Sequence, residues 1–345
     1  MKKELFIIKI FTLMILFQLT SCSRKNSNDL TEILPPKAGL ISGVGGFNDR
    51  GFNQLALMGL QSVANDFDLK TASRESIDTS DFTPNINSLI QEGYNLIILL
   101  GYEAAGAVLT AAKNNPTVNF VLLDYSSTDI PANLAYYVYQ VDQSAFLCGF
   151  IGAYWAQVKD PQNPMAGWIG GLDIPVIQQF RTGYEGGIQY FNNKYQKTVS
   201  SAGFFATSFN DTLQGAKLAD SLIMLGTDVI FPFAGKTGNG ALYKIKEKEK
   251  WGIGVDFDQY VSIPEVSGIL LTSCLKKMNN SVYNIIAWIN YHGFTGQKIE
   301  YGNLSTVDIE IAPFHDYDAL IPDSIKKELN SIRSGIKDGT IHTGW

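Results

Sequence analysis

Short apolar segments alternate with longer amphipathic segments along most of this chain, and this alternation constrains its fold more than any other feature. The segments 38–41, 96–100 and 120–124 are apolar nearly throughout and are bounded by turn residues, which is typical of buried strands. The segments 52–67 and 104–113 carry apolar residues three to four positions apart, which predicts helices. Fully apolar strands separated by helices indicate a parallel sheet that is covered on both faces. We therefore predict an α/β fold with a doubly wound sheet.

The same pattern occurs twice, which predicts two similar lobes rather than one large sheet. The run 93–97 (GYNLI) is echoed by the run 226–230 (GTDVI), and both runs lead into an apolar strand. In each half the next strand ends in an aspartate, Asp124 in the first and Asp256 in the second. The apolar helix expected around 145–151 opens the second lobe.

The N-terminal segment has the pattern of an export signal. A basic start (Met-Lys-Lys) precedes the apolar stretch 10–17, which is too short to span a bilayer. The tetrapeptide Leu-Thr-Ser-Cys, which ends at Cys22, resembles a bacterial lipobox; the alternative is a plain signal peptide with an incidental cysteine. We expect residues 1–22 to be a lipoprotein signal and residues 23–37 a flexible tether. The protein would then be anchored by lipid at the bacterial cell membrane or outer membrane, facing the periplasm or the exterior.

Composition disfavours several classes of function. A net charge of -6 argues against a nucleic-acid partner, which usually requires a basic surface. The three cysteines are scattered, and three histidines leave little for a zinc site or a histidine base. We therefore expect no metal site, no cofactor and no catalytic residue.

Several polar residues have ordinary structural explanations. Asp49 and Asp211 precede helical patterns, so we expect them to cap helices rather than to bind a ligand. Cys148 and Cys274 lie in apolar runs and are expected to be inert, buried thiols.

Candidate binding residues lie where strands end, because ligands of open α/β sheets bind at the carboxyl ends of the strands. Asp124 and Asp256 end strands, and Gly235 follows another strand. Phe52 and Phe209 lie where a loop enters a helix. If the two lobes face one another, these five residues line one cleft. Two aromatic faces and two carboxylates suit a neutral, flat, polyhydroxylated ligand.

Eight short motifs and the single residue Asp124 occur in order along the chain, from about residue 38 to residue 315. They are GFNDRGFNQ (46–54), Asp124, FLCG (146–149), GGLDIP (170–175), FRTGYEGG (180–187), SFND (208–211), AGKTGNG (234–240), GVDFDQ (254–259) and LTSCLK (271–276). No single motif is specific, but the ordered set resembles the basic membrane lipoprotein family. Its members are lipid-anchored substrate-binding proteins, several of them purine-nucleoside receptors of ABC transporters.

The resemblance implies a type I periplasmic-binding-protein fold, in which two Rossmann-like lobes are joined by a three-crossover hinge. It assigns residues 38–141 and 270–297 to the N-terminal lobe, and residues 142–269 and 298–345 to the C-terminal lobe. It also implies a monomer that captures a purine nucleoside and delivers it to an ABC permease.

The resemblance further implies how the base is held. Phe52 and Phe209 would sandwich the purine, and Asp124 would accept a hydrogen bond from its edge. Family members often carry an aspartate where this chain has Ser-Gly-Val-Gly at 42–45, so we expect the base to be read differently here.

The ribose would be held by a second group of residues. By position, Asp256 and Lys276 would bind the hydroxyl groups and neutralise each other, with Asn53 and the backbone at Gly235 in support.

Other functions remain open at this point. The same fold serves binding proteins for other small solutes such as sugars, and a surface adhesin or sensory receptor is a further alternative. A nucleoside hydrolase is disfavoured, because such enzymes usually carry an aspartate cluster near the N-terminus, where residues 42–52 contain only Asp49. The Gly-Lys-Thr run at 235–237 lacks the earlier glycine that a phosphate-binding loop requires.

Overall fold

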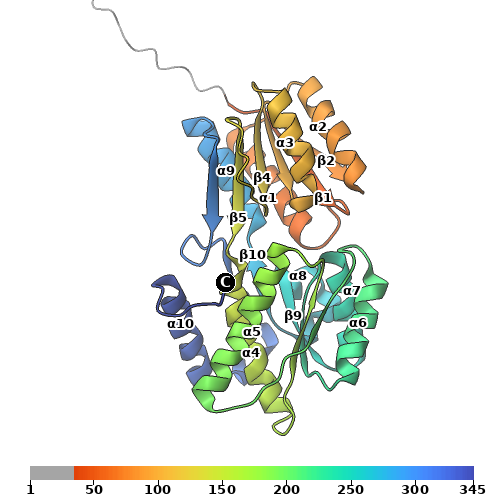
Figure 1. Ribbon diagram of the computed structural model, residues 1–345, viewed down its shortest axis with the longest axis vertical. Coiled ribbons are helices and arrows are strands. Elements are labelled where there is room, and N and C mark those ends of the chain that lie inside the picture. Colours follow the sequence, from red (N-terminus) through yellow and green to blue (C-terminus); the bar gives the residue numbers. More distant parts are fainter. Residues whose placement is uncertain (1–34) are drawn as a thin grey trace, which may run out of the picture. The chain divides into compact units, whose positions relative to one another are not determined.

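The computed structural model describes residues 35–345 (Figure 1). The predicted signal 1–22 with its lipidation site Cys22, and residues 23–34 of the predicted tether, lie outside the described residues. Within the described part of the chain, no helix is both long and apolar enough to cross a bilayer.

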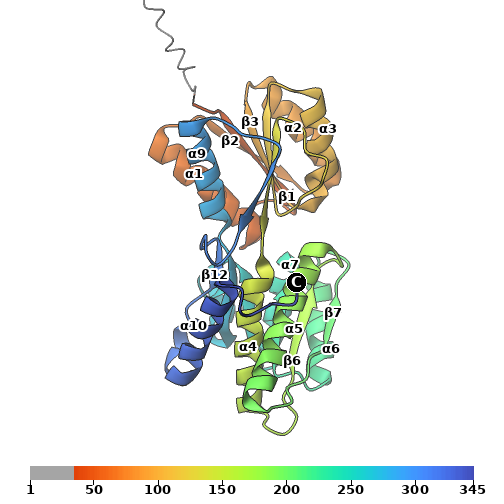
Figure 2. The ribbon, with the colours of Figure 1, turned by 60° about the vertical axis from the view of Figure 1, so that its left-hand side comes forward.

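The first lobe is built on a six-stranded sheet with helices on both faces. In sheet order its strands are β11 (Lys298–Gly302), β5 (Leu134–Tyr139), β4 (Asn119–Leu123), β3 (Leu96–Leu100), β1 (Ala38–Val44) and β2 (Thr71–Ser76). Its helices are α1 (Phe52–Phe67), α2 (Phe82–Gln91), α3 (Ala105–Asn114) and α9 (Met278–His292). Figures 1 and 2 show α1 and α9 together on one side of the sheet and α2 and α3 on the other.

Alternating side chains of β3 explain why this strand is apolar throughout. Leu96, Ile98 and Leu100 pack in the cluster that contains the buried residues of α1 and α9. Ile97 and Leu99 pack in the cluster that contains those of α2 and α3. Since both faces are covered, each residue of the strand is buried, as expected for a central strand of a parallel sheet.

The second lobe repeats this arrangement. In sheet order its strands are β12 (Ile309–Ile311), β10 (Leu270–Lys276), β9 (Trp251–Asp256), β8 (Val229–Phe233), β6 (Ala166–Gly170) and β7 (Gly203–Phe205). Its helices are α4 (Val141–Lys159), α5 (Pro175–Tyr195), α6 (Thr212–Met224), α7 (Gly235–Glu247), α8 (Gln259–Ser262) and α10 (Asp323–Lys337). Position by position, the strands from β6 to β10 take the places of β1 to β5 in the first sheet. The predicted fold of two α/β lobes is confirmed.

The chain passes between the two sheets three times, after β5, after β10 and after β11. The lobe boundaries differ from those expected at two strands. The segment 270–276, expected in the N-terminal lobe, forms β10 and pairs in parallel with β9 of the second sheet. The segment 298–302, expected in the C-terminal lobe, forms β11 and pairs in parallel with β5 of the first sheet. The order of elements along a chain does not reveal these pairings, because the partner strands are distant in sequence.

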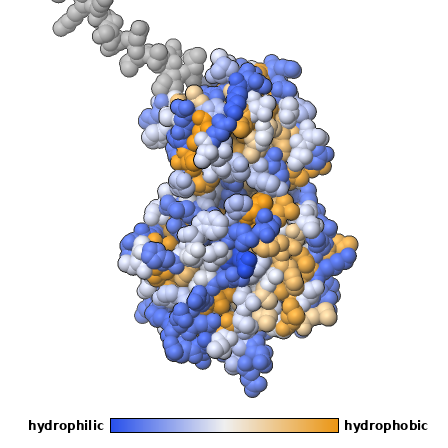
Figure 3. All heavy atoms as spheres, in the orientation of Figure 1, coloured by the Kyte–Doolittle hydropathy of each residue, from blue (hydrophilic) through white to orange (hydrophobic). Residues whose placement is uncertain are grey.

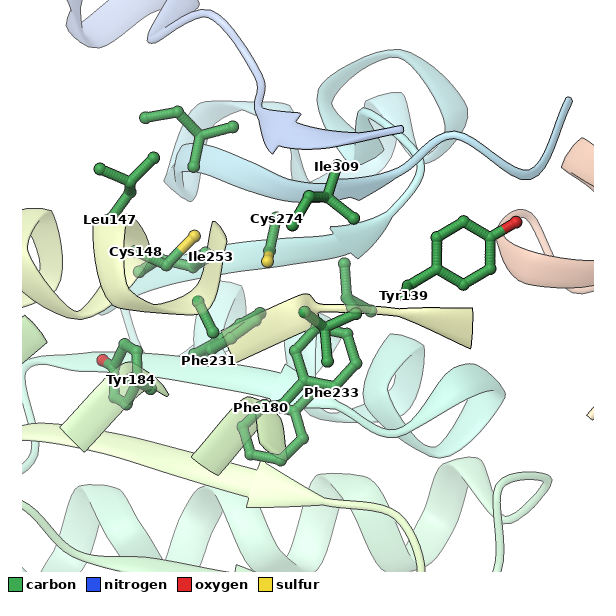
Figure 4. Close-up of a cluster of buried hydrophobic side chains, with 14 of the residues drawn as sticks. Tyr139, Leu147, Cys148, Phe180, Tyr184, Phe231, Phe233, Ile253, Cys274 and Ile309 are labelled. Atoms are coloured by element: carbon green, nitrogen blue, oxygen red, sulfur yellow. The ribbon is translucent and has the colours of Figure 1, made fainter. Parts of the chain in front are cut away.

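Helices α4 and α5 approach so closely that glycine is required at their contact. A Cβ atom on Gly149 would lie 1.9 Å from the carbonyl oxygen of Tyr184, and one on Gly187 would lie 2.0 Å from that of Phe146. The larger side chains around this contact form the core of the second lobe, shown in Figure 4.

The core also contains the two cysteines of the described residues. Cys148 and Cys274 are buried within it and are free thiols, and Figure 4 shows their sulfur atoms facing one another. Burial raises the pKa of the Cys148 thiol well above its ordinary value, so its reactive thiolate form is disfavoured.

Candidate functional site

A cleft between the two lobes brings together all of the residues that sequence reasoning selected for ligand binding. Its lining includes Phe52, Asn53, Asp124, Phe209, Gly235, Asp256 and Lys276. The space-filling view shows the molecule narrowing at the level where the two lobes meet (Figure 3).

The start of α1 delivers Phe52 and Asn53 to the cleft. The carboxylate of Asp49 accepts hydrogen bonds from the backbone N–H groups of Gly51, Asn53 and Gln54, at 2.8–3.1 Å. These bonds satisfy the free donors of the first helical turn, which confirms the capping role expected for Asp49. The side-chain oxygen of Asn53 accepts a bond of 2.8 Å from the N–H of Gly43, so its NH2 group remains for a ligand.

The two strand-ending aspartates share an unusual backbone conformation. Asp124 follows β4 with φ of 67°, and Asp256 ends β9 with φ of 63°. This left-handed region is strained for most residues and is tolerated best by glycine, asparagine and aspartate. Because β4 and β9 occupy equivalent positions in their sheets, the two carboxylates enter the cleft from opposite lobes.

Lys276 carries a buried positive charge between the two aspartates. Its side chain is 3% exposed, and its Nζ lies 2.8 Å from Asp124 and 3.9 Å from Asp256. The expectation paired it with Asp256, but the hydrogen-bonded partner is Asp124. The rings of Phe52 and Phe180 also lie within 5.3 Å of Nζ, in the range of cation–π attraction.

Asp256 is consequently a poorly compensated carboxylate. Burial, together with the negative charges of Asp124 and Asp49, raises its pKa to about 7, and Lys276 only partly opposes this rise. A carboxylate in this environment gains from hydroxyl or N–H donors that a ligand would bring.

Phe209 lies in the loop before α6 and is positioned by backbone contacts. Its carbonyl oxygen accepts a bond of 3.1 Å from Thr237 N–H, in the first turn of α7. Its ring lies over Gly171, where a Cβ atom would be 2.0 Å from the ring. Gly235, the first residue of α7, has φ of 57° and brings the backbone close to the same loop.

Other cleft residues were missed by the sequence reasoning. Tyr102 and Glu103 follow β3 directly, so the rule that found Asp124 at the end of β4 could also have found them. Lys236 follows Gly235 at the start of α7. Phe180 and Phe233 stack on each other, with ring centroids 5.4 Å apart. Phe180 lies inside α5 and carried no local signal, whereas Phe233 is the last residue of β8, so the strand-end rule could have found it.

Hydrogen bonds join the lobes across the cleft. The Nζ atom of Lys236 donates to the carbonyl oxygen of Gly45 at 2.8 Å, and Asn239 Nδ2 donates to that of Asp49 at 3.0 Å. Two further contacts hold the same loop: Ser262 Oγ to the Arg50 carbonyl at 2.9 Å, and Arg50 to Glu265 at 3.0 Å. The loop 45–50 of the first lobe is thus held against α7 and the segment 262–265 of the second.

Comparison with known proteins identifies the family. A family model described as "ABC transporter substrate-binding protein PnrA-like" (Bmp) matches residues 38–341. The chain is 31% identical over 334 residues to Basic membrane protein A1 of Borrelia garinii subsp. bavariensis, covering 94% of this chain and 93% of that protein. It is 31% identical over 317 residues to the ABC transporter nucleoside-binding protein BmpA of Lactococcus lactis subsp. cremoris, covering 87% of each chain.

Solved structures show the same fold. The crystal structure of an ABC transporter solute-binding protein from Aeropyrum pernix K1 superposes with a TM-score of 0.81 at 22% identity, covering 89% of this chain and 93% of that chain. The chain therefore belongs to the PnrA-like family of ABC transporter substrate-binding proteins, which bind small molecules for a permease and are not enzymes.

Proposed function

We propose that this protein captures a purine nucleoside between its two lobes and delivers it to the permease of an ABC transporter. The observation that carries the proposal is the cleft itself, in which Phe52 and Phe209 enter from opposite lobes beside Asp124, Asp256 and Lys276. Aromatic faces on both sides of a slot suit a flat base, and each stacked face contributes ~1–3 kcal/mol in proteins that bind single-stranded nucleic acids.

The polar residues divide into a base end and a ribose end. Asp124 has an oxygen, Oδ1, that is buried without a hydrogen-bond partner, and we assign it to an N–H group of the base. Asp256 and Lys276 would hold the ribose hydroxyls, since a carboxylate accepts from them and an ammonium donates to them. The NH2 group of Asn53 and the backbone at Gly235 would support the ligand. A relative named as a nucleoside-binding protein supports this assignment.

The charge of the cleft favours a neutral ligand. Four carboxyl groups line it, from Asp49, Glu103, Asp124 and Asp256, against the two ammonium groups of lysines. Both ammonium groups already have partners, Asp124 for Lys276 and the Gly45 carbonyl for Lys236, so a phosphate group would find no free counter-charge in this lining. We therefore expect the protein to bind nucleosides and to exclude nucleotides.

A titration of the purified full-length protein in mild detergent tests the function. Bound ligand is first removed by unfolding in urea and refolding, and heat is then measured on adding adenosine, guanosine, inosine, cytidine, ribose or adenosine 5′-monophosphate. We expect purine nucleosides to bind with Kd of about 1 μM or tighter, equivalent to ~8 kcal/mol, and cytidine to bind weakly. Ribose and the monophosphate are expected to give no heat. Binding of sugars in place of nucleosides would favour another small solute, and no response to any compound would favour a surface role.

We further propose that Cys22 is lipidated and holds the protein at the membrane outside the cytoplasm. The support is the signal pattern of residues 1–22 together with the family, because a substrate-binding protein must meet its permease at the membrane surface.

The bonds across the cleft are expected to slow ligand release. In the Lys236→Met variant the side chain keeps its length but loses the charged hydrogen bond to Gly45. Loss of this bond makes the closed, ligand-bound form less stable. We therefore expect the nucleoside to dissociate about tenfold faster, with little change in its association rate. Stopped-flow fluorescence measures both rates. Lys244→Met, on the same helix but outside the cleft, is the matched control, and an unchanged dissociation rate in Lys236→Met would contradict the expectation.

A further inference from the structure

We propose that Glu103 reads the edge of the purine base together with Asp124, and so determines which bases the protein accepts. This inference rests on the proposed nucleoside function and assigns a specificity role to a residue that sequence reasoning did not select.

The sheet places Glu103 beside Asp124. Strand β3 is the neighbour of β4, and the two strands run parallel, so the residues that follow them emerge at the same edge. Asp124 directly follows β4, and Glu103 lies in the single 3-10 turn (Tyr102–Ala104) that follows β3. Both residues line the cleft.

The carboxyl group of Glu103 folds back toward the end of its own strand. Its Oε2 lies 3.2 Å from the position that a Cβ atom on Gly101 would take, and Gly101 itself lines the cleft. Without a side chain on Gly101, the carboxyl group has room beside the strand end.

Both carboxyl groups have hydrogen-bonding capacity that the protein does not use. Lys276 occupies one oxygen of Asp124, and the other oxygen, Oδ1, is buried and unpartnered. Among residues 35–345, the only hydrogen bond that the carboxyl of Glu103 accepts is from its own backbone N–H. Burial and the negative charge of Asp124 raise the pKa of Glu103, which favours a protonated carboxyl that donates as well as accepts.

An acceptor beside a carboxylic acid complements the six-membered edge of a purine. Adenine presents an N–H donor at position 6 beside the acceptor N1, and hypoxanthine presents the N1–H donor beside the acceptor O6. Asp124 Oδ1 would accept from the donor and Glu103 would donate to the neighbouring acceptor. The donor and the acceptor exchange places between the two bases, so adenine and hypoxanthine would form both bonds with this edge in opposite orientations. 1-Deazaadenosine keeps the amino donor but has C–H in place of the N1 acceptor, so it would keep the bond to Asp124 Oδ1 and lack the bond from Glu103.

The test compares inosine, adenosine and 1-deazaadenosine by titration calorimetry on the full-length protein. In Glu103→Leu we expect affinity for adenosine to fall at least about tenfold relative to that for 1-deazaadenosine, which has no N1 acceptor for Glu103 to bind. If Glu103→Leu folds poorly, Glu103→Asp replaces it in the test. This variant withdraws the carboxyl by one methylene and should show the same selective loss. Glu103→Gln, whose amide both donates and accepts, should bind inosine within about threefold of wild type. Glu92→Gln, outside the cleft, is the control.

The outcomes separate this inference from the proposed function. Suppose that the wild type binds nucleosides. If Glu103→Leu then binds them equally well, or with affinity reduced equally for all three ligands, the role of Glu103 is overturned and the proposed function stands. Failure of the wild type to bind any of the three would overturn the nucleoside function and this inference with it.

Discussion

The Asp256→Asn variant is expected to lose nucleoside binding while its ligand-free form becomes more stable than the wild type at pH 8. Asp256 is the carboxylate that we assign to the ribose hydroxyls, and an amide cannot accept from two of them in the same way. Hydrogen bonds to a charged group are strong, so we expect affinity to fall about 100-fold. Titration calorimetry with the best purine ligand measures this loss.

The gain in stability follows from the pKa of Asp256. Its pKa is about 7 in the folded protein, against 3.8 for an ordinary aspartate, so ionisation opposes folding. This destabilisation is fully present above pH 7 and disappears as the pH falls below 4. A pKa difference of one between the folded and unfolded states corresponds to ~1.4 kcal/mol of stability. The amide that replaces the carboxylate also loses hydration on burial, which offsets part of the gain. We therefore expect a net gain of about 2 kcal/mol in the free energy of unfolding. Urea unfolding at pH 8, 6 and 4.5 should show the two proteins converging at the lowest pH.

A matched control is a buried carboxylate that the protein itself satisfies. Asp142 is 5% exposed, accepts hydrogen bonds from Gln179 and Thr343, and lies outside the cleft lining. Burial raises the pKa of Asp142 too, although these hydrogen bonds oppose the rise. Asp142→Asn should bind nucleoside normally and should gain less stability than Asp256→Asn, because an amide NH2 would face one of these donors. If Asp256→Asn retained wild-type affinity, the assignment of Asp256 to the ligand would be wrong.

The Phe209→Leu variant is expected to reduce affinity for purine nucleosides by about 10- to 100-fold, because one stacking face of ~1–3 kcal/mol is lost. Leucine keeps an apolar side chain over Gly171, so the loop before α6 should retain its packing. Phe209 is a cleaner test than Phe52, whose ring also contacts the charge of Lys276 at 5.3 Å.

Two comparisons make the Phe209 experiment decisive. Phe204→Leu alters an exposed ring on β7, outside the cleft lining, and should leave affinity unchanged. Phe209→Tyr keeps the aromatic face and should bind within about threefold of wild type. Equal affinities for Phe209→Leu and wild type would exclude stacking on this ring as a source of binding energy.

Much of the fold could be predicted from local sequence. The apolar run at 96–100 indicated a strand covered on both faces, and Leu96 and Ile97 indeed pack in different clusters. Asp211 was expected to cap a helix, and its carboxylate accepts from Gln214 N–H at 2.8 Å. The strand-ending rule also brought Asp124 and Asp256 to one cleft. These predictions succeed because periodicity, capping and strand ends depend on a few neighbouring residues.

The rest of the site depends on contacts between distant segments. The ion pair of Lys276 with Asp124 joins residues 152 apart in the chain, and the bond of Lys236 to Gly45 joins residues 191 apart. Similarly, the sheet to which β10 and β11 belong was decided by their partners β9 and β5.

The amino-acid pattern was enough to predict the two α/β lobes and the aspartates that line the cleft at two strand ends, because it specifies where strands and helices begin and end. Which carboxylate Lys276 neutralises depends on how the two lobes pack, and this packing leaves Asp256 poorly compensated. The tertiary structure also placed the carboxyl of Glu103 beside Asp124. Such pairings depend on distances of a few ångströms between separate elements, and electrostatic energies change steeply over those distances.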